Sequence, residues 1–194
     1  GDNEAALQAL RLLLVRLDEC AYLAVAPHVN LVTVLIRAQR HDEAITMART
    51  LLARFERRRS SGPSATLLHC LARACLAQGD TAQARDALQR LWPLAQNDDT
   101  AQNWACCAAL LAALEQRPLA ALRLLGYSDA ANEKAAPGGT RDAAGRAMAE
   151  RAEALACRAL DCEAAPDAMR AHKDPGARLS EDDMVALALA WVEA

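Results

Sequence analysis

The stretch from Ala77 to Ala84 reads Ala-Gln-Gly-Asp-Thr-Ala-Gln-Ala, and it decides the fold prediction. A polar turn at Gly79-Asp80 is followed by a small residue, Ala84. The same order occurs four times along the chain, at intervals of 38, 40 and 37 residues between the alanines. These four residues, here called the phased alanines, are Ala6, Ala44, Ala84 and Ala121. An alanine one turn into a helix lets that helix approach the preceding one closely, so the repeat predicts consecutive helix hairpins.

Apolar residues at spacings of three and four surround each phased alanine, which is typical of amphipathic helices. The predicted second helices carry Leu7, Leu10, Leu13, Leu14 and Leu17; Ile45, Ala48, Leu51 and Leu52; Ala87, Leu88 and Leu91; and Leu122, Leu124 and Leu125. The predicted first helices carry Val32, Leu35 and Ile36; Leu68, Leu71, Ala72 and Cys75; and Trp104, Ala108, Leu111 and Ala112. Helix starts are indicated by Pro27, Pro63 and Pro118, and N-caps by Asp80 and by Asp98 to Thr100.

The composition of the 194-residue chain agrees with an all-α fold. Hydrophobic residues make up 53% and aromatic residues only 3%, so alanine and leucine must build the core. These are strong helix formers, whereas a β-sandwich would need more β-branched and aromatic residues. The net charge of the chain is −3, whereas a nucleic-acid-binding domain usually has an excess of basic residues. A local run at Arg54 and Arg57–Arg59 fits either a solvated helix end or a contact with an acidic partner.

The residues from Ala77 to Ala84 and from His41 to Ile45 resemble the turn of the tetratricopeptide repeat. This resemblance implies a right-handed α-solenoid of antiparallel hairpins whose first helices line a concave groove. The period here is longer than the usual ~34 residues, and the aromatic residue of the first helix is mostly missing. The first copy has only its second helix, and one hairpin cannot bury its apolar face alone. We therefore expect a partner helix upstream, and thus a fragment of a longer protein.

The last third of the chain does not continue the repeat, because the phasing stops after Gly126. We predict tetratricopeptide-like repeats over residues 1–130, a loop over residues 131–140, and C-terminal capping helices over residues 141–194. Within that last region, we expect a helix from Arg141 to Leu160 and a short one from Glu163 to Ala171. A third helix begins at Ser180 and includes Met184, Leu187, Leu189 and Trp191 on its apolar side.

A more specific resemblance lies in the same region. The residues from Pro118 to Ala130 and the ending from Leu179 to Ala188 are similar to the tail of bacterial signal-transduction ATPases that regulate transcription. The segment around Pro166 departs from that tail, because a proline interrupts the expected helix. The resemblance implies upstream winged-helix and NB-ARC-like domains. ATP with magnesium, and DNA, would then bind only in those upstream domains.

Catalytic motifs are not found in the sequence. It contains no phosphate-binding loop of the GxxxxGK[ST] type and no HExxH motif, and no Ser–His–Asp group can be argued. His69-Cys70 with Cys75 is read as packing rather than as a metal site, and Cys106-Cys107 as buried thiols. We therefore predict a non-enzyme with no cofactor or metal of its own. Seven cysteines without a disulfide pattern, and no signal or membrane-spanning segment, favour a cytoplasmic protein.

A recognition surface is the remaining prediction. Residues of the first helices that the apolar stripes do not need would line the groove, and those proposed for binding are Thr33, His69, Arg73, Asn103 and Trp104. The ligand would be a protein or a small-molecule inducer, and the domain would be the sensor of a bacterial transcriptional regulator. The alternative is a free-standing tetratricopeptide scaffold or chaperone. The Lys and Asn set that clamps a C-terminal carboxylate in chaperone-binding repeats is not apparent.

Overall fold

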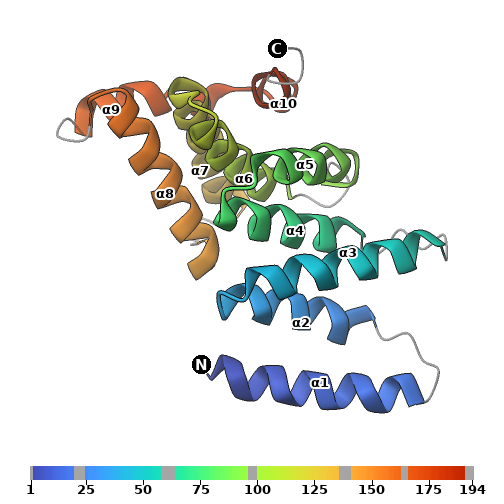
Figure 1. Ribbon diagram of the computed structural model, residues 1–194. Helices are drawn as coiled ribbons and strands as arrows, with labels where there is room; N and C mark the ends of the chain where they lie inside the picture. Colours follow the sequence, from blue (N-terminus) through green and yellow to red (C-terminus); the bar gives the residue numbers. More distant parts are fainter. Residues whose placement is uncertain are drawn as a thin grey trace. The chain divides into compact units, whose positions relative to one another are not determined.

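The computed structural model describes residues 2–19, 25–57, 64–95, 100–135, 141–162 and 166–190. This part of the chain is all-α, as predicted, and contains no strand. Its helices are α1 (Asn3–Glu19), α2 (Val25–Arg37), α3 (His41–Arg57), α4 (Ser64–Gln78), α5 (Thr81–Ala95), α6 (Ala101–Leu114), α7 (Pro118–Ala135), α8 (Ala143–Ala159), α9 (Pro166–Lys173), the short 3-10 helix η1 (Gly176–Arg178) and α10 (Glu181–Leu189) (Figure 1).

The described residues group into two compact units. Unit 1 comprises Gly1–Leu91 and unit 2 comprises Trp92–Ala194, so the boundary falls within α5. This boundary does not coincide with the division that we predicted at residue 130. Within unit 1, α1, α2, α3 and α4 follow one another as a stack in chain order (Figure 1). Within unit 2, α6 packs against both α7 and α8.

The phased alanines occupy the same place in four helices. Each backbone N–H donates to the carbonyl oxygen four residues earlier, at 3.2, 3.0, 3.1 and 3.0 Å, and the acceptors belong to Asp2, Arg40, Asp80 and Arg117. Ala44, Ala84 and Ala121 have no exposed surface, and Ala6 is half-buried. The prediction that each phased alanine stands one turn into a helix is therefore confirmed.

The turns between paired helices share one backbone geometry. Gln39, Gly79 and Gln116 have φ values of 60°, 78° and 59° and end α2, α4 and α6. The N–H of each bonds to the carbonyl oxygen three residues back, and the next N–H reaches the carbonyl five residues back. This pair of bonds satisfies carbonyl groups that the helix end would otherwise leave without a partner.

A fourth turn of this kind follows α8, where none was predicted from the sequence. Asp161 has a φ of 53°, and the N–H of Cys162 bonds to the carbonyl oxygen of Cys157 at 2.9 Å. The turn geometry thus continues beyond Gly126, where the phasing of alanines stops. The reason is that the left-handed residue and its hydrogen bonds form the turn, and neither requires an alanine afterwards.

The apolar stripe of α1 is less covered than the stripes of α3, α5 and α7. The positions four and seven residues after the phased alanine are buried in those three helices: Ala48 and Leu51, Leu88 and Leu91, and Leu125 and Ser128. In α1 the equivalent Leu10 is half-buried and Leu13 is 43% exposed. Leu7 and Leu14, which adjoin Leu10 on the helix, are buried. One face of α1 therefore lacks the cover that its counterparts have.

Unit 2 is built around α6, whose side chains are buried without interruption from Trp104 to Ala113. Two glycines let neighbouring backbones approach. A Cβ on Gly126 of α7 would lie 2.1 Å from the carbonyl oxygen of Lys173, and one on Gly176 would lie 1.9 Å from that of Arg123. Because neither position has room for a side chain, α7 packs directly against the end of α9 and the start of η1.

Several boundaries differ from the sequence prediction. The loop predicted for residues 131–140 is wrong in its first half, because α7 continues to Ala135; in this last turn, the side-chain amide of Asn132 donates to the carbonyl oxygen of Ser128 at 2.7 Å. Thr100 stands at the start of α6, but its side chain makes no capping bond. The caps at Asp80 and Ser180 are confirmed. Predictions for Cys20, Arg58–Pro63, Asp98, residues 136–140, residues 163–165 and Trp191 lie outside the described residues.

Candidate interaction surface

Three of the predicted groove residues lie in unit 1, on the first helices α2 and α4. The Thr33 hydroxyl on α2 donates to the carbonyl oxygen of Val29 at 3.0 Å and lies 3.8 Å from the Cys70 sulfur on α4. His69 precedes Cys70, and Arg73 lies one helical turn further along α4. All three predicted residues are half-buried. The structure thus gives unit 1 a polar surface that spans two neighbouring first helices.

The other two predicted residues lie in unit 2 and differ in exposure. Asn103 is exposed in the first turn of α6. Trp104 is only 1% exposed, and its ring centroid lies 4.9 Å from that of Trp92 at an interplanar angle of 56°. The prediction that Trp104 lines a groove is therefore wrong, because this indole packs in the core of unit 2. Cys106, on the same helix, is also buried and donates to the carbonyl oxygen of Gly145 at 3.7 Å.

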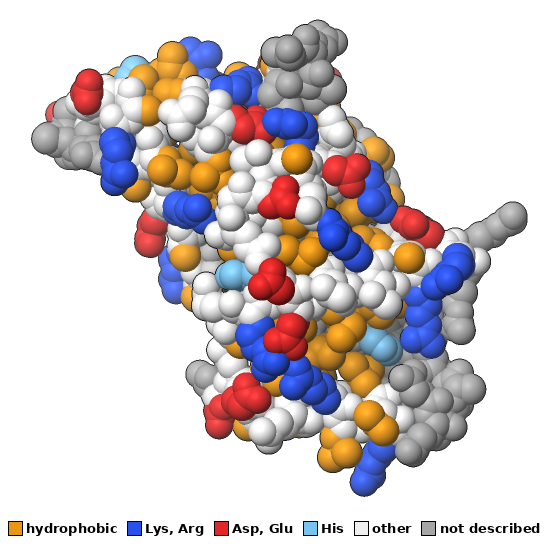
Figure 2. Space-filling model, viewed as in Figure 1, with side chains coloured by type: hydrophobic (Ala, Val, Ile, Leu, Met, Phe, Trp, Pro, Cys, Tyr) orange, Lys and Arg blue, Asp and Glu red, His pale blue; other side chains and the backbone are white. Residues whose placement is uncertain are grey.

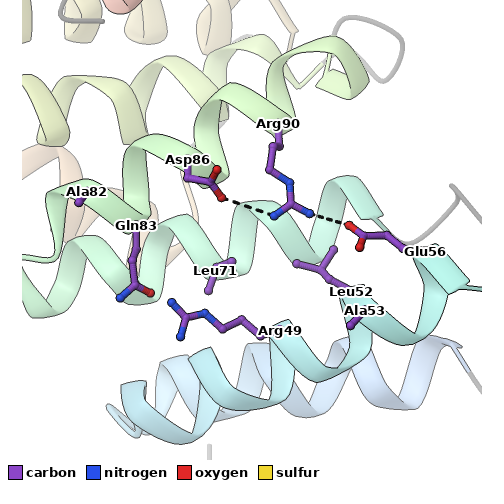
Figure 3. Close-up of a pocket in the computed structure, with 9 residues that line it drawn as sticks. All are labelled: Arg49, Leu52, Ala53, Glu56, Leu71, Ala82, Gln83, Asp86 and Arg90. Atoms are coloured by element: carbon purple, nitrogen blue, oxygen red, sulfur yellow. Dashed lines mark hydrogen bonds and ion pairs between the residues drawn. The ribbon is translucent and has the colours of Figure 1, made fainter.

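A cleft that was not predicted from the sequence lies between α3 and α5 in unit 1 (Figure 3). It is open to solvent and has a volume of about 420 Å³. The lining residues come from α3, from α4 and from α5: Arg49, Leu52, Ala53, Glu56, Leu71, Ala82, Gln83, Asp86 and Arg90. Leu52 and Leu71 are 3% and 5% exposed, so they form an apolar floor. We call this feature the α3–α5 cleft.

Charged side chains stand at both ends of the α3–α5 cleft. At one end, the Arg90 guanidinium lies 2.6 Å from a Glu56 oxygen and 3.4 Å from an Asp86 oxygen (Figure 3). Arg90 thereby links the second helices α5 and α3. At the other end lie Arg49 and Gln83. Within the part of the chain that the structure describes, Arg49 takes part in no ion pair.

The sequence contains a signal from which this cleft could have been found. Arg49, Ala53 and Glu56 are spaced by four and three residues and so lie on one face of a helix. Ala82, Asp86 and Arg90 share a face of the next second helix in the same way. Because recognition was predicted on the first helices, the charges of the second helices did not enter that prediction.

The cysteines of the described residues are buried, which agrees with the reading as packing. Buried thiols are found at Cys70, Cys75, Cys106, Cys107, Cys157 and Cys162. Burial, with a smaller contribution from Asp80, raises the pKa of the Cys75 thiol to about 11, while Arg49 opposes this shift. A thiol with that pKa is a poor nucleophile near neutral pH. The described residues contain no group of three or more His, Cys, Asp or Glu placed to hold a metal ion.

Charges on the visible face of the molecule are mixed in sign. Figure 2 shows Lys and Arg side chains interspersed with Asp and Glu side chains, with apolar patches between them. This pattern offers no continuous basic track for a nucleic-acid backbone on that face. No helix among the described residues combines the length and the hydrophobicity that crossing a membrane requires.

Comparison with protein families gives one match. A family model described as "Tetratricopeptide repeat" matches residues 22–97. This match supports a tetratricopeptide-repeat domain in that part of the chain. The match covers α2 to α5 and therefore includes the α3–α5 cleft and the polar surface of α2 and α4. The tetratricopeptide-like all-α fold is confirmed. No curated protein and no solved structure gives a significant match.

Tetratricopeptide repeats stack into surfaces that bind protein partners, and such domains are generally non-catalytic. In this chain, the matched residues present two surfaces of different chemistry. The first helices offer Thr33, His69 and Arg73, and the second helices offer the α3–α5 cleft. Both are suited to recognition by hydrogen bonds and charge, since each combines buried apolar neighbours with polar side chains.

Proposed function

We propose that this chain is the non-catalytic sensor domain of a bacterial transcriptional regulator and that its first helices bind a protein partner or a small-molecule inducer. The observation that carries the binding role is the polar surface of α2 and α4 within the matched repeats. The regulatory context is supported by the tail resemblance, above all at Leu179–Ala188. Ligand binding would shift the whole protein between two states by binding one of them more tightly.

The first test concerns the gene. Reading the codons upstream of residue 1 should reveal a nucleotide-binding domain and a DNA-binding domain. If the reading frame encoded neither, the regulator context would be abandoned. The binding role would then belong to a free-standing tetratricopeptide scaffold, which is the alternative that we retain.

The second test concerns the surface. In the full-length protein, Arg73→Glu should abolish the transcriptional response to the inducing signal, because it reverses the charge of the polar surface of α2 and α4. The affinity of the same variant for promoter DNA should be unchanged. Arg16→Glu is the matched control, since Arg16 is exposed in the last turn of α1. Equal responses from the native protein and from folded Arg73→Glu would remove this surface from the proposed function.

A further inference from the structure

The α3–α5 cleft has the dimensions of a ligand site. Its volume of about 420 Å³ falls within the range of about 300 to 1,000 Å³ typical of pockets that hold small ligands or a few side chains. Its floor is apolar, because Leu52 and Leu71 lie there, and Ala53 and Ala82 line it with small side chains. An aliphatic side chain entering the cleft would remove apolar surface from water without displacing a charged group from the floor.

The charges at the two ends are opposite in sign. Arg90 is shared by two carboxylates, Glu56 and Asp86, so the residues that line this end carry one more negative than positive charge. The other end carries Arg49, for which no ion pair occurs among the described residues. The cleft is therefore apolar in the middle, positive at one end and negative at the other (Figure 3). A ligand with a negative group beside Arg49 and a positive group beside Glu56 and Asp86 would complement this arrangement.

We propose that the α3–α5 cleft binds a short segment of a partner protein that presents an acidic side chain to Arg49, an aliphatic side chain to Leu52 and Leu71, and a basic side chain to Glu56 and Asp86. The same charges disfavour a phosphate-rich ligand, because the two carboxylates repel it. None of the lining residues belongs to the polar surface of α2 and α4. The cleft is thus a second recognition site, and its existence does not depend on the proposed function.

A peptide selection tests the proposal directly. A phage-displayed library of random peptides is selected on the full 194-residue chain and counter-selected on its Arg49→Glu variant. The surviving peptides should contain an Asp or Glu and a Lys or Arg on either side of an aliphatic residue. Their Kd should rise about tenfold on Arg49→Glu, and Arg16→Glu, an equivalent reversal at an exposed residue of α1, should leave it unchanged. Circular dichroism confirms that both variants are folded.

The negative end is tested with the same peptides. Asp86→Asn should weaken the binding of peptides that carry the basic residue, and replacing that residue by Gln in the peptide should remove the difference. Exchanging the acidic residue of the peptide for Lys should restore binding to Arg49→Glu. The proposal is overturned if no peptide distinguishes the native chain from Arg49→Glu, or if the survivors lack this order of charges. The transcriptional response of the Arg73→Glu variant tests the proposed function separately. Either result of that test leaves the peptide-binding test of the α3–α5 cleft unaffected.

Discussion

Leu13 on α1 and Leu51 on α3 stand seven residues after a phased alanine, yet Leu13 is 43% exposed and Leu51 is 2% exposed. The two side chains are chemically identical and occupy equivalent positions in two second helices. What differs is the cover on that face of the helix. The pair therefore separates the effect of burial on stability from the effect of residue type.

Leu51→Ala should lower the free energy of unfolding by about 2 to 5 kcal/mol, because it removes a buried side chain and leaves a cavity. Leu13→Ala should cost less than about 1 kcal/mol, since much of that side chain is already in water. Urea denaturation followed by circular dichroism measures both values. Similar costs for the two variants would mean that the face of α1 is covered in solution.

The turn at Gln116 should be improved by glycine. A residue other than glycine pays about 1 kcal/mol for a φ near 60°, so Gln116→Gly should raise the free energy of unfolding by roughly that amount. Gly79→Ala is the opposite change in the equivalent turn and should lower stability by about as much. Thermal and urea unfolding of the two variants measure the effect. A loss of stability in Gln116→Gly would contradict the shared role of these turns.

Asp129 should be important for stability because it pairs with two largely buried cations. Its carboxylate lies 2.6 Å from Arg141 and 2.7 Å from Lys173, whose side chains are 15% and 20% exposed. Burial opposes the charge of Lys173, but hydrogen bonds to Asp129 and Glu153 hold the pKa of its ammonium group above the usual value. Asp129→Asn should therefore cost about 1 to 3 kcal/mol.

The exposed pair of Asp86 with Arg90 provides the comparison for Asp129. Asp86→Asn should change the free energy of unfolding by less than about 0.5 kcal/mol, because surface ion pairs contribute little. Both variants are compared by urea denaturation at one pH and salt concentration. If Asp129→Asn were as mild as Asp86→Asn, the ion pairs of unit 2 would not contribute to its stability.

His41 should make stability fall as the solution is acidified. Burial lowers the pKa of its imidazole, with Asp42 opposing the shift, so the unfolded chain binds the proton more readily than the folded one. The contribution is fully present above the unfolded pKa of about 6.5 and is lost as the pH falls through that value toward the folded pKa. Measured between pH 8 and 5, His41→Gln should lose less stability than the native chain. Parallel curves for the two proteins would contradict this role.

The hairpin architecture could be predicted from the sequence because its cause is local. The small residue at Ala84 and the left-handed position at Gly79 both act within a few residues of the turn. The fourth turn was missed because Asp161 reaches the same geometry without a glycine or a phased alanine. The sequence places the end of α7 too early, because asparagine is typical of loops, whereas the side chain of Asn132 bonds back to the helix.

Site prediction was less successful because exposure depends on tertiary neighbours. The place of Trp104 on a first helix predicts a groove residue, but Trp92, twelve residues earlier, packs against it in the core. The α3–α5 cleft requires two helices from different hairpins to lie side by side. The charge pattern on each helix was visible in the sequence, but the spacing between Glu56 and Arg90 becomes informative only once they are known to meet.

The repeated turn after α2 and α4 has a consequence for how such a chain can change length. A polypeptide without residues 41–80 would pass from Arg40 to Thr81, with Gln39 still in the left-handed conformation and Ala84 four residues beyond Arg40. Every hydrogen bond that defines the turn would have the same donor and acceptor positions as before. Duplication or deletion of one hairpin in the gene therefore preserves the turn between the helices. The number of repeats can evolve without any new loop.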